Sequence, residues 1–210
     1  MTPLLPEDLL PADYQGWNHQ STIFDKLVRE TDPTDVIEVG TWKGMSAMRL
    51  YKAMEAIKLP VMGKDWRLWC CDTWLGGIEH MEGEAFGGLF RTEYGYPTLY
   101  RQFLSNMQHA GCLDHLRTVP NTSANCARWL ARRKVTAQLI YIDGSHETPD
   151  VFHDLSGYWP LLAPGGVMFG DDWPHPPVSG DVRRFAQGAN VAPTVVEGNY
   201  WVLRKAPKVN

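Results

Sequence analysis

Residues 35–57, DVIEVGTWKGMSAMRLYKAMEAI, predict a strand, a tight turn and a helix in that order. The apolar run at the start ends at Gly40, and apolar residues then return at helical spacing from Met45 to Ile57. The same alternation recurs along the chain, with strands predicted over 67–74, 116–120, 137–143 and 165–173 and helices over 98–111, 123–134 and 148–162. Strands that alternate with helices predict a mostly parallel sheet covered on both faces.

The two ends of the chain depart from this alternation. Three prolines make residues 1–20 a poor candidate for regular structure, so this segment either packs over the domain as an arm or is disordered. Near the C-terminus a helix is predicted over 181–189, and residues 194–205 read as two short strands around Gly198 and Asn199, a hairpin signal. We therefore expect an α/β fold: a doubly wound, mostly parallel seven-stranded sheet with an antiparallel C-terminal edge.

Length and composition bound the organisation of the chain. Its 210 residues suit one domain, expected over 21–210, with a lid-like insertion at 75–97 that is rich in glycine, aromatic residues and acids. With 44% hydrophobic residues, 21% charged residues and a net charge of −4, nothing favours nucleic acid, and small molecules are the expected partners. Four cysteines without a C-x-x-C pair are expected to be buried, reduced thiols.

Membrane and export signals are not expected. The apolar runs end well short of the ~20 residues needed to cross a bilayer. The N-terminus carries acids and prolines where a signal peptide has a basic start and an apolar core. We therefore expect a cytoplasmic protein that does not act in a membrane.

The turn after the first strand is the first candidate for ligand binding. Gly40 and Gly44 allow a sharp exit from the strand and a helix that begins close to a ligand, and Glu38 precedes them. The spacing is not the dinucleotide fingerprint G-x-G-x-x-G, and Trp42 stands where a glycine would let a pyrophosphate approach, which argues against NAD. The alternative is that both glycines serve only packing.

The ends of the next two strands carry polar residues. Asp72 ends the second strand, where a carboxylate can accept both hydroxyls of a ribose, although a helix cap is the alternative. Asn121 and Ser123 follow the third strand and would contact an adenine ring or cap the following helix; for Ser123 the cap is at least as well supported.

Three carboxylates are expected to converge at the ends of the fourth and fifth strands. Asp143 ends the fourth, and Asp171 and Asp172 end the fifth. Carboxylates that lie this close either hold a proton or bind a cation, and oxygen ligands favour Mg²⁺, with Ca²⁺ or Mn²⁺ as alternatives. His146 follows Asp143 and is placed to accept a proton near neutral pH. Taken singly, each residue has a plainer interpretation as a turn, a solvated loop or a surface histidine.

Three segments together resemble class I S-adenosylmethionine-dependent methyltransferases, and in particular the Mg²⁺-dependent branch of macrocin-type and other sugar O-methyltransferases. The segments are VIEVGTWKGMSA, CCDTWLGG and LIYIDGSHETPDVFHDLSGYWPLLAPGGVMFGDDW, and the resemblance covers roughly residues 20–205. The bend L-x-P-G-G is widespread in class I methyltransferases, whereas IDGSH combined with GDDW is narrower. The resemblance implies S-adenosylmethionine and Mg²⁺ as cofactors and a small-molecule hydroxyl acceptor, such as a sugar diol or a catechol.

The resemblance also implies a role for each matching position. Those of the cofactor site are Glu38, Gly40, Thr41 and Gly44 in the turn, Asp72 at the ribose, Asn121 and Ser123 near the adenine, and Asp143. Those of the metal site are Asp143, Asp171 and Asp172. Some relatives carry a catalytic acid where this chain has Ser145; others use a histidine three residues after the first metal ligand, which His146 matches, so His146 is the expected general base.

Other functions remain open on the sequence alone. One is a metal-independent O- or N-methyltransferase of the same fold. Another is a nucleotide-dependent oxidoreductase, or a ligand-binding relative without catalytic activity. Related enzymes often assemble through such arms, so a homo-oligomer is a further expectation. The arm and the 75–97 insertion, with Phe86, Phe90, Tyr94 and Tyr96, are expected to cover the acceptor.

Overall fold

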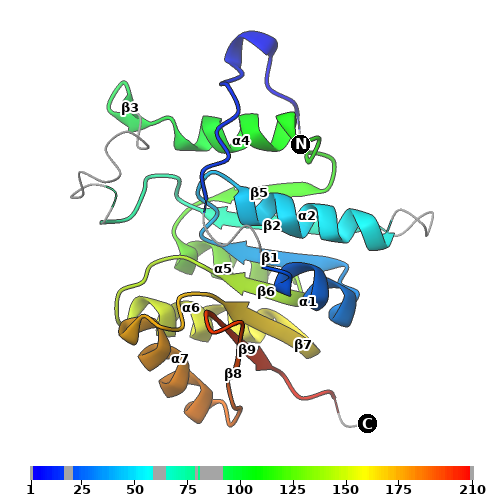
Figure 1. The fold of residues 1–210 in the computed structure, drawn as a ribbon, viewed down its shortest axis with the longest axis vertical. Helices are drawn as coiled ribbons and strands as arrows, with labels where there is room; N and C mark the ends of the chain where they lie inside the picture. The colour runs from blue at the N-terminus through cyan, green and yellow to red at the C-terminus, as the bar shows by residue number, and fades with distance from the viewer. Residues whose placement is uncertain (1, 17–20, 59–64, 79, 81–91, 209–210) are drawn as a thin grey trace.

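A computed structural model of the chain describes residues 2–16, 21–58, 65–78, 80 and 92–208. A seven-stranded sheet forms its centre, in the order β5-β2-β1-β6-β7-β9-β8 (Figure 1). In that order the strands are Leu116–Pro120, Arg67–Asp72, Asp35–Val39, Ala137–Ile142, Leu162–Gly170, Tyr200–Arg204 and Thr194–Val196. The first five are parallel, and β9 is antiparallel to both β7 and β8. The predicted fold class and its antiparallel edge are confirmed.

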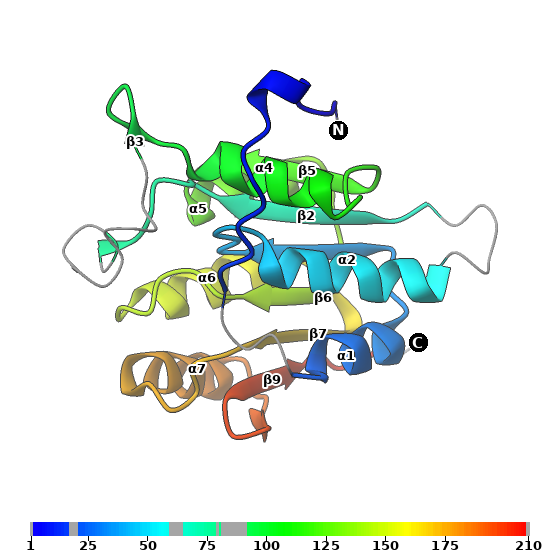
Figure 2. The same cartoon turned by 45° about the horizontal axis from the view of Figure 1, so that its top comes forward.

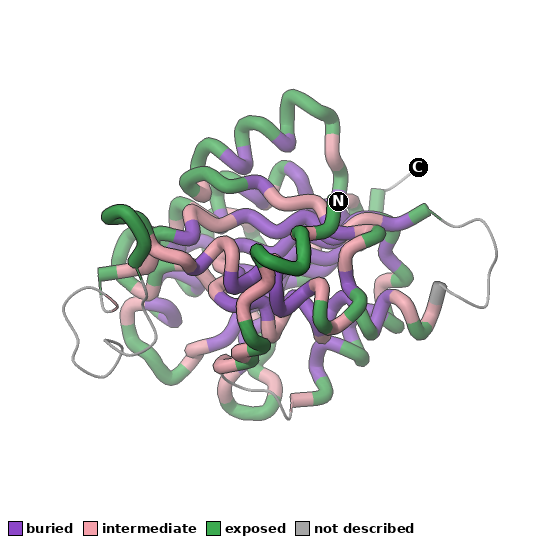
Figure 3. The backbone as a smooth tube through the Cα atoms, turned by 90° about the horizontal axis from the view of Figure 1, so that it is seen from above, coloured by how far each residue is buried: buried purple, intermediate pink, exposed green. Residues whose placement is uncertain are grey.

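Helices cover both faces of the sheet, because the parallel strands are apolar on both sides. The helices are α1 Ile23–Thr31, α2 Met45–Lys58, α4 Leu99–His109, α5 Ser123–Arg132, α6 Asp150–Tyr158 and α7 Pro176–Gly188. In β1 all five residues are buried: Val36 packs with α1, α2 and α4 on one face, and Ile37 packs with α5, α6 and α7 on the other. Figure 2 shows α2 in front of the strands, and Figure 3 shows the buried stretches of backbone gathered in the centre with exposed stretches around them.

Several predicted boundaries shift at prolines. The predicted helix 148–162 is divided into α6 and a 3-10 helix, Trp159–Leu161, because Pro160 cannot continue the hydrogen-bonding of an α-helix. Helix α7 begins at Pro176, five residues before its predicted start, since proline suits a first helical turn. Strand β7 ends at Gly170, so Asp171 and Asp172 lie just beyond the strand.

The four cysteines are free and buried, as predicted. Residues 2–16 cross α4 and include a 3-10 helix, Pro6–Asp8 (Figure 1). Within the insertion predicted at 75–97, β3 Thr92–Glu93 pairs with β4 Tyr96–Pro97, whereas residues 79 and 81–91, with Phe86 and Phe90, lie outside the described residues. Among the helices of the described residues, none has both the length and the apolar character that a membrane span requires.

Candidate active site

Residues 40–44, which we call the cofactor turn, connect β1 to α2. Gly40 has a φ of 79° and Gly44 a φ of 90°, and Trp42 between them also has a positive φ of 49°. A Cβ atom on Gly40 would lie 1.8 Å from the carbonyl oxygen of Asp143, and one on Gly44 would lie 2.9 Å from the ring of Phe103. Neighbouring parts of the protein therefore require both glycines, which is the packing alternative considered above and is compatible with ligand binding.

Asp72 holds the cofactor turn at the end of β2. Its Oδ2 accepts hydrogen bonds from the backbone N–H groups of Thr41 at 2.7 Å and Trp42 at 2.9 Å. Its Oδ1 accepts one from the N–H of Trp74 at 2.6 Å, a local turn rather than a helix cap. Both lone pairs of Oδ2 are thus engaged and Oδ1 keeps one, so the ribose role of Asp72 stays a prediction alongside this structural one.

Glu38 lies beneath the cofactor turn and is completely buried. Its carboxyl group accepts a hydrogen bond from Ser46 Oγ and a longer contact, 3.6 Å, from Cys70 Sγ. Burial raises the pKa of Glu38 to about 8, and the nearby carboxylates Asp143 and Asp72 add to the effect. Glu38 therefore carries a proton at neutral pH and supports the turn from inside the core.

The loop after β5 differs from one expectation. Thr122, not Ser123, is the N-cap of α5, and its Oγ1 accepts a hydrogen bond from the N–H of Asn125 at 3.4 Å. The interpretation of Ser123 as a helix cap is therefore wrong, because its hydroxyl donates to Asp154 on α6. Asn121 accepts from the N–H of Thr122, at 2.9 Å. Both predicted adenine-binding residues thus have partners within the protein.

Asp154 is a site residue that the sequence did not indicate. Burial raises its pKa to about 6, and its Oδ2 lies 3.2 Å from where a Cβ on Gly144 would stand. It therefore lies between the loop after β5 and the loop after β6. Its partner Ser123 is 31 residues away in sequence, so no local pattern could have found this contact.

Asp143, His146 and Asp172 form what we call the acid cluster, at the ends of β6 and β7. One ligand atom from each lies within 4.8 Å of the others. The His146 Nε2 atom is 3.2 Å from Asp172 Oδ2 and 3.6 Å from Asp143 Oδ1, and the hydroxyl of Tyr141 donates to Asp143 Oδ2 at 3.1 Å. Two carboxylate oxygens and an imidazole nitrogen at these separations suit a divalent cation.

Asp172 itself shows the strain of this arrangement. Burial raises its pKa, Asp143 raises it further, and His146 and His175 lower it. Its backbone φ is 54°, in the left-handed region that side chains other than glycine rarely adopt. Asp172 is thus partly buried and has an unfavourable backbone conformation at the position where its carboxylate lies beside His146.

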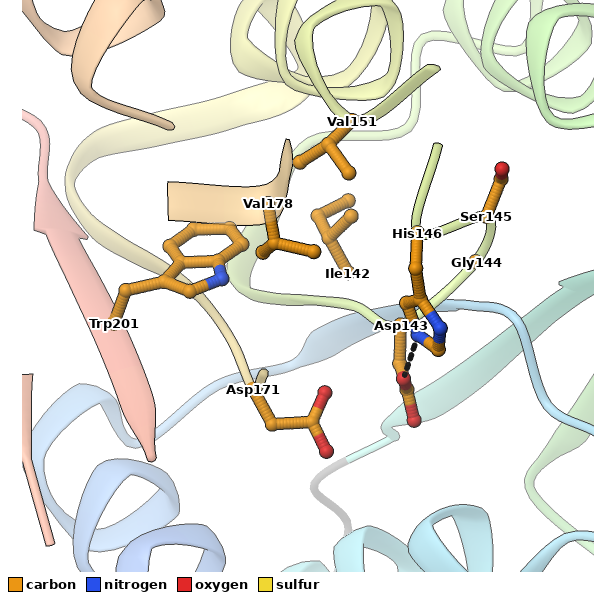
Figure 4. Close-up of a pocket in the computed structure, with 9 residues that line it drawn as sticks. All are labelled: Ile142, Asp143, Gly144, Ser145, His146, Val151, Asp171, Val178 and Trp201. Carbon is orange, nitrogen blue, oxygen red and sulfur yellow. Dashed lines mark ion pairs between the residues drawn. The ribbon is translucent and has the colours of Figure 1, made fainter. Parts of the chain in front are cut away.

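Asp171 lies apart from the acid cluster and is buried. It lines a pocket between α6, α7 and β9, and Figure 4 shows its carboxylate turned toward the side where Asp143 lies. The residues that line this pocket are Ile142, Asp143, Gly144, Ser145, His146, Val151, Asp171, Val178 and Trp201. Of the three predicted metal ligands, the structure brings Asp143 and Asp172 together with His146 and places Asp171 on the adjoining wall.

The cofactor turn and the acid cluster are neighbours, because β1 and β6 are adjacent parallel strands. The N–H of Asp143 donates to the carbonyl of Val39 at 2.7 Å, and Gly40 lies directly against Asp143. Both lie at the carboxyl ends of the strands, the edge at which open α/β sheets bind ligands.

Comparisons with known proteins identify the family of the chain and proteins of similar fold. A family model described as "Methyltransferase domain" matches residues 37–173. No curated protein matches the chain. The chain is similar to the O-methyltransferase from Bacillus cereus in complex with SAH, at 16% identity over 93% of this chain and 84% of that chain, with a TM-score of 0.63.

Two further solved structures are similar. One is the O-methyltransferase TomG from Streptomyces achromogenes in complex with SAM, at 18% identity, 93% and 83% coverage, and a TM-score of 0.63. The other is CalS11, a TDP-rhamnose 3'-O-methyltransferase of calicheamicin biosynthesis, at 19% identity, 87% and 77% coverage, and a TM-score of 0.60. The family model covers well over half of the chain. The chain therefore belongs to the methyltransferase-domain family and has the class I methyltransferase fold, which confirms the predicted resemblance to class I methyltransferases.

Proposed function

We propose that this protein is an S-adenosylmethionine-dependent, divalent-metal-assisted O-methyltransferase that acts on a hydroxyl of a small molecule. The observation that carries the proposal is the acid cluster, in which Asp143, His146 and Asp172 meet beside the cofactor turn. Its support includes the two similar structures in complex with SAH or SAM and, separately, the similarity to the apo structure of a sugar O-methyltransferase. The proposed acceptor is a sugar or another metabolite with two neighbouring oxygens, which would chelate the ion.

The cofactor is assigned to the edge formed by β1, β2, β5 and β6. The residues proposed to contact or support it are Glu38, Gly40, Thr41, Gly44, Asp72, Asn121, Ser123 and Asp143. Bound S-adenosylmethionine would supply a methyl group already activated by its sulfonium. The protein's task is then to fix the turn, which Asp72 does through the N–H groups of Thr41 and Trp42, and to aim the acceptor oxygen at the methyl carbon.

The donor set of the acid cluster fits a hard divalent cation such as Mg²⁺. Asp143 and Asp172 would each supply a carboxylate oxygen, with Asp171 as the further ligand expected from the sequence. A cation bound there would lower the pKa of an acceptor hydroxyl. It would also balance two carboxylates that otherwise face each other across a single imidazole.

His146 is proposed as the general base. His146 Nε2 would accept the hydroxyl proton as the acceptor oxygen takes the methyl group and the cofactor's carbon–sulfur bond breaks, which leaves S-adenosylhomocysteine. The carboxylate of Asp172, 3.2 Å from that nitrogen, then stabilises the imidazolium. Tyr141 keeps Asp143 in place through its hydroxyl, and the nitrogen of the base lies near both carboxylates.

One observation favours a second candidate, a metal-independent methyltransferase. The contact between His146 and Asp172 is a carboxylate–imidazole pair that can accept a proton without a cation. In that case Asp143 would only orient the imidazole, 3.6 Å away. The two candidates differ in their response to a chelator.

The test combines ligand binding with methyl transfer. We expect the wild-type protein to bind S-adenosylhomocysteine in a calorimeter, to bind Mn²⁺ by electron paramagnetic resonance, and to methylate a member of a panel of sugar diols and catechols. EDTA should abolish the transfer and Mg²⁺ should restore it. Activity that survives EDTA would favour the metal-independent candidate, and wild-type protein that does not bind S-adenosylhomocysteine would refute the proposal.

A histidine variant tests the base. We expect His146→Ala to lower turnover by about 100-fold or more, because the proton has lost its acceptor, while the affinities for S-adenosylhomocysteine and Mn²⁺ change little. His153→Ala is the matched control, since His153 is exposed on α6 and lies outside the acid cluster. If His146→Ala loses Mn²⁺ binding as well, His146 is a metal ligand rather than the base.

A further inference from the structure

We infer that the N-terminal arm, residues 2–16, completes the cofactor site by holding the cofactor turn, with Asp13 and Gln15 as positioning residues. The inference rests on the proposed function, since it requires the turn to contact S-adenosylmethionine. The arm would then act on the cofactor site, whereas the sequence predicted that it covers the acceptor.

Side chains of α4 hold the arm in place through hydrogen bonds to the backbone of the arm. Gln108 binds the N–H and the carbonyl of Leu4, at 2.7 and 3.2 Å. Arg101 donates to the carbonyl of Asp8 at 2.7 Å, and Ser105 accepts from the N–H of Leu10 at 3.0 Å. Because these contacts use the backbone of the arm, they define its path without depending on its side chains.

Asn106 on α4 connects the arm to the cofactor turn. Its side chain is fully buried. Its Oδ1 accepts from the N–H of Asp13 at 2.9 Å, and its Nδ2 donates to the carbonyls of Asp13 at 2.7 Å and Lys43 at 2.8 Å. One amide therefore binds both segments at once and fixes the distance between them.

An ion pair then joins the two segments directly. Lys43 Nζ lies 2.8 Å from Asp13 Oδ2, and the lysine side chain is only 2% exposed. An ammonium group removed from water to this extent needs a carboxylate nearby, or its desolvation is not compensated. Lys43 can therefore keep its place in the turn only while Asp13 is docked.

Trp42 also depends on the docked arm for its position in the cofactor turn, through a contact with Gln15. Its indole N–H donates to Gln15 Oε1 at 2.6 Å, and its ring stacks on His80 with 4.1 Å between the ring centroids. Its backbone has a φ of 49°, a conformation that costs free energy for a bulky residue and persists only where surrounding contacts enforce it. Gln15 supplies one of these contacts.

The last described residue of the arm passes the start of α2. A Cβ on Gly16 would lie 2.6 Å from the Cβ of Met45, the first residue of that helix. The arm thus contacts the cofactor turn at Trp42 and Lys43 and the helix that follows it. If these contacts are lost, the turn is in its binding conformation for a smaller fraction of the time, and the apparent dissociation constant of the cofactor rises by the same factor.

The experiment measures S-adenosylhomocysteine binding by calorimetry, with the thermal unfolding midpoint recorded for every variant. Asp13→Asn keeps the backbone contacts to Asn106 and removes the charge that faces Lys43. Gln15→Leu removes the acceptor for Trp42 without changing any charge. The matched control, Gln108→Ala, removes two hydrogen bonds at the far end of the arm, away from the turn.

We expect Asp13→Asn to weaken binding about tenfold, the result of a turn that is competent about a tenth of the time. Gln15→Leu should weaken binding in the same direction, and Gln108→Ala should leave it within about twofold, even where the unfolding midpoints fall equally. In the Lys43→Met background the Asp13→Asn change should have little further effect, because Asp13 acts through Lys43.

The outcomes separate this inference from the proposed function. If Asp13→Asn and Gln15→Leu bind as tightly as the wild type, or if Gln108→Ala weakens binding as much as they do, the arm does not position the turn and only the inference fails. A full Asp13→Asn effect in the Lys43→Met background would also overturn it. If the wild type does not bind S-adenosylhomocysteine, both proposals fail. If Asp13→Asn does not fold, Gln15→Leu still decides.

Discussion

The cofactor turn and the acid cluster lie side by side, yet they are built in opposite ways. In the turn, the N–H groups of Thr41 and Trp42 are bonded to Asp72, and the ammonium of Lys43 is paired with Asp13. In the acid cluster, two carboxylates share one imidazole, and burial raises the pKa of Asp172. The turn is preorganised by the protein alone, whereas the cluster keeps an excess of negative charge.

This difference indicates which interactions serve stability and which serve a ligand. Contacts that the protein satisfies for itself should cost stability when they are removed. Carboxylates held together without enough positive charge repel each other, so removing one should cost binding or turnover and leave the folded state as stable or more stable. Substitutions at Gly40, Asp143 and Glu38 test this contrast, in order of decreasing expected effect.

Gly40→Ala should break both regions at once. The new Cβ would lie 1.8 Å from the carbonyl oxygen of Asp143 and would occupy a backbone with a φ of 79°. We expect the free energy of unfolding to fall by about 4 kcal/mol, from overpacking and left-handed strain together, as measured by urea denaturation.

Gly111→Ala is the control for that substitution. Gly111 has a φ of 69° and no atom within 4 Å of its Cβ position, so the variant carries the backbone strain alone and should lose about 1 to 2 kcal/mol. Equal losses in the two variants would show that the contact between Gly40 and Asp143 contributes nothing.

Asp143→Asn should sharpen the contrast from the side of the acid cluster. The variant keeps an oxygen that can accept from Tyr141, and it removes one of the two charges beside His146. We expect Mn²⁺ affinity, measured by electron paramagnetic resonance, to fall by about 100-fold while the unfolding midpoint stays equal or rises. Asp114→Asn, at an exposed position, should change neither quantity. A large drop in the unfolding midpoint would show that Asp143 is chiefly structural.

Glu38→Gln tests the buried acid under the cofactor turn through pH. The folded-state pKa of Glu38 is about 8, above the ordinary value of 4.5, so the folded state favours the protonated form. The resulting stability is fully present below pH 4.5 and is lost as pH rises through 8. Between pH 7 and 8 the wild type should lose about 1 kcal/mol of unfolding free energy relative to Glu38→Gln, as measured by urea denaturation.

The control for that experiment is Glu55→Gln. This substitution removes a partly exposed carboxylate from α2, the helix that begins beside the cofactor turn. Its stability should follow the wild-type pH dependence. If Glu38→Gln also follows it, Glu38 is ionised in the folded protein, and the cofactor turn rests on a charge rather than on a neutral carboxyl group.

The fold was predictable because short stretches of the sequence show the apolar spacing of each strand and helix. The apolar run before Gly40 and the helical spacing after Met45 are both visible within 35–57, and repetition of that unit fixes the class of sheet. The boundaries at Pro160 and Pro176 were not predicted, because a proline can either end a helix or occupy its first turn. Which of the two occurs depends on how the surrounding segments pack.

The site was predictable in part. Strand ends brought Asp143 and Asp172 together with His146, as parallel topology requires. The sequence could not show that Asp172 joins the acid cluster while Asp171 lines the adjoining pocket. Neighbouring residues beyond a strand point to different sides, and the left-handed φ of Asp172 sets the direction of its side chain. The partnership of Ser123 with Asp154 depends on the packing of α5 against α6, which no sequence spacing encodes.

The path of the arm across α4 also bears on the order in which the molecule assembles. Its contacts with the cofactor turn join residues 27 and 30 positions apart, whereas its hydrogen bonds to α4 join residues 91 to 104 positions apart. Loop closure over such a span adds entropic cost that only the later contacts repay. Because Asn106 of α4 binds both the arm and the carbonyl of Lys43, we expect the cofactor turn to reach its final shape only after α4 has packed beside it.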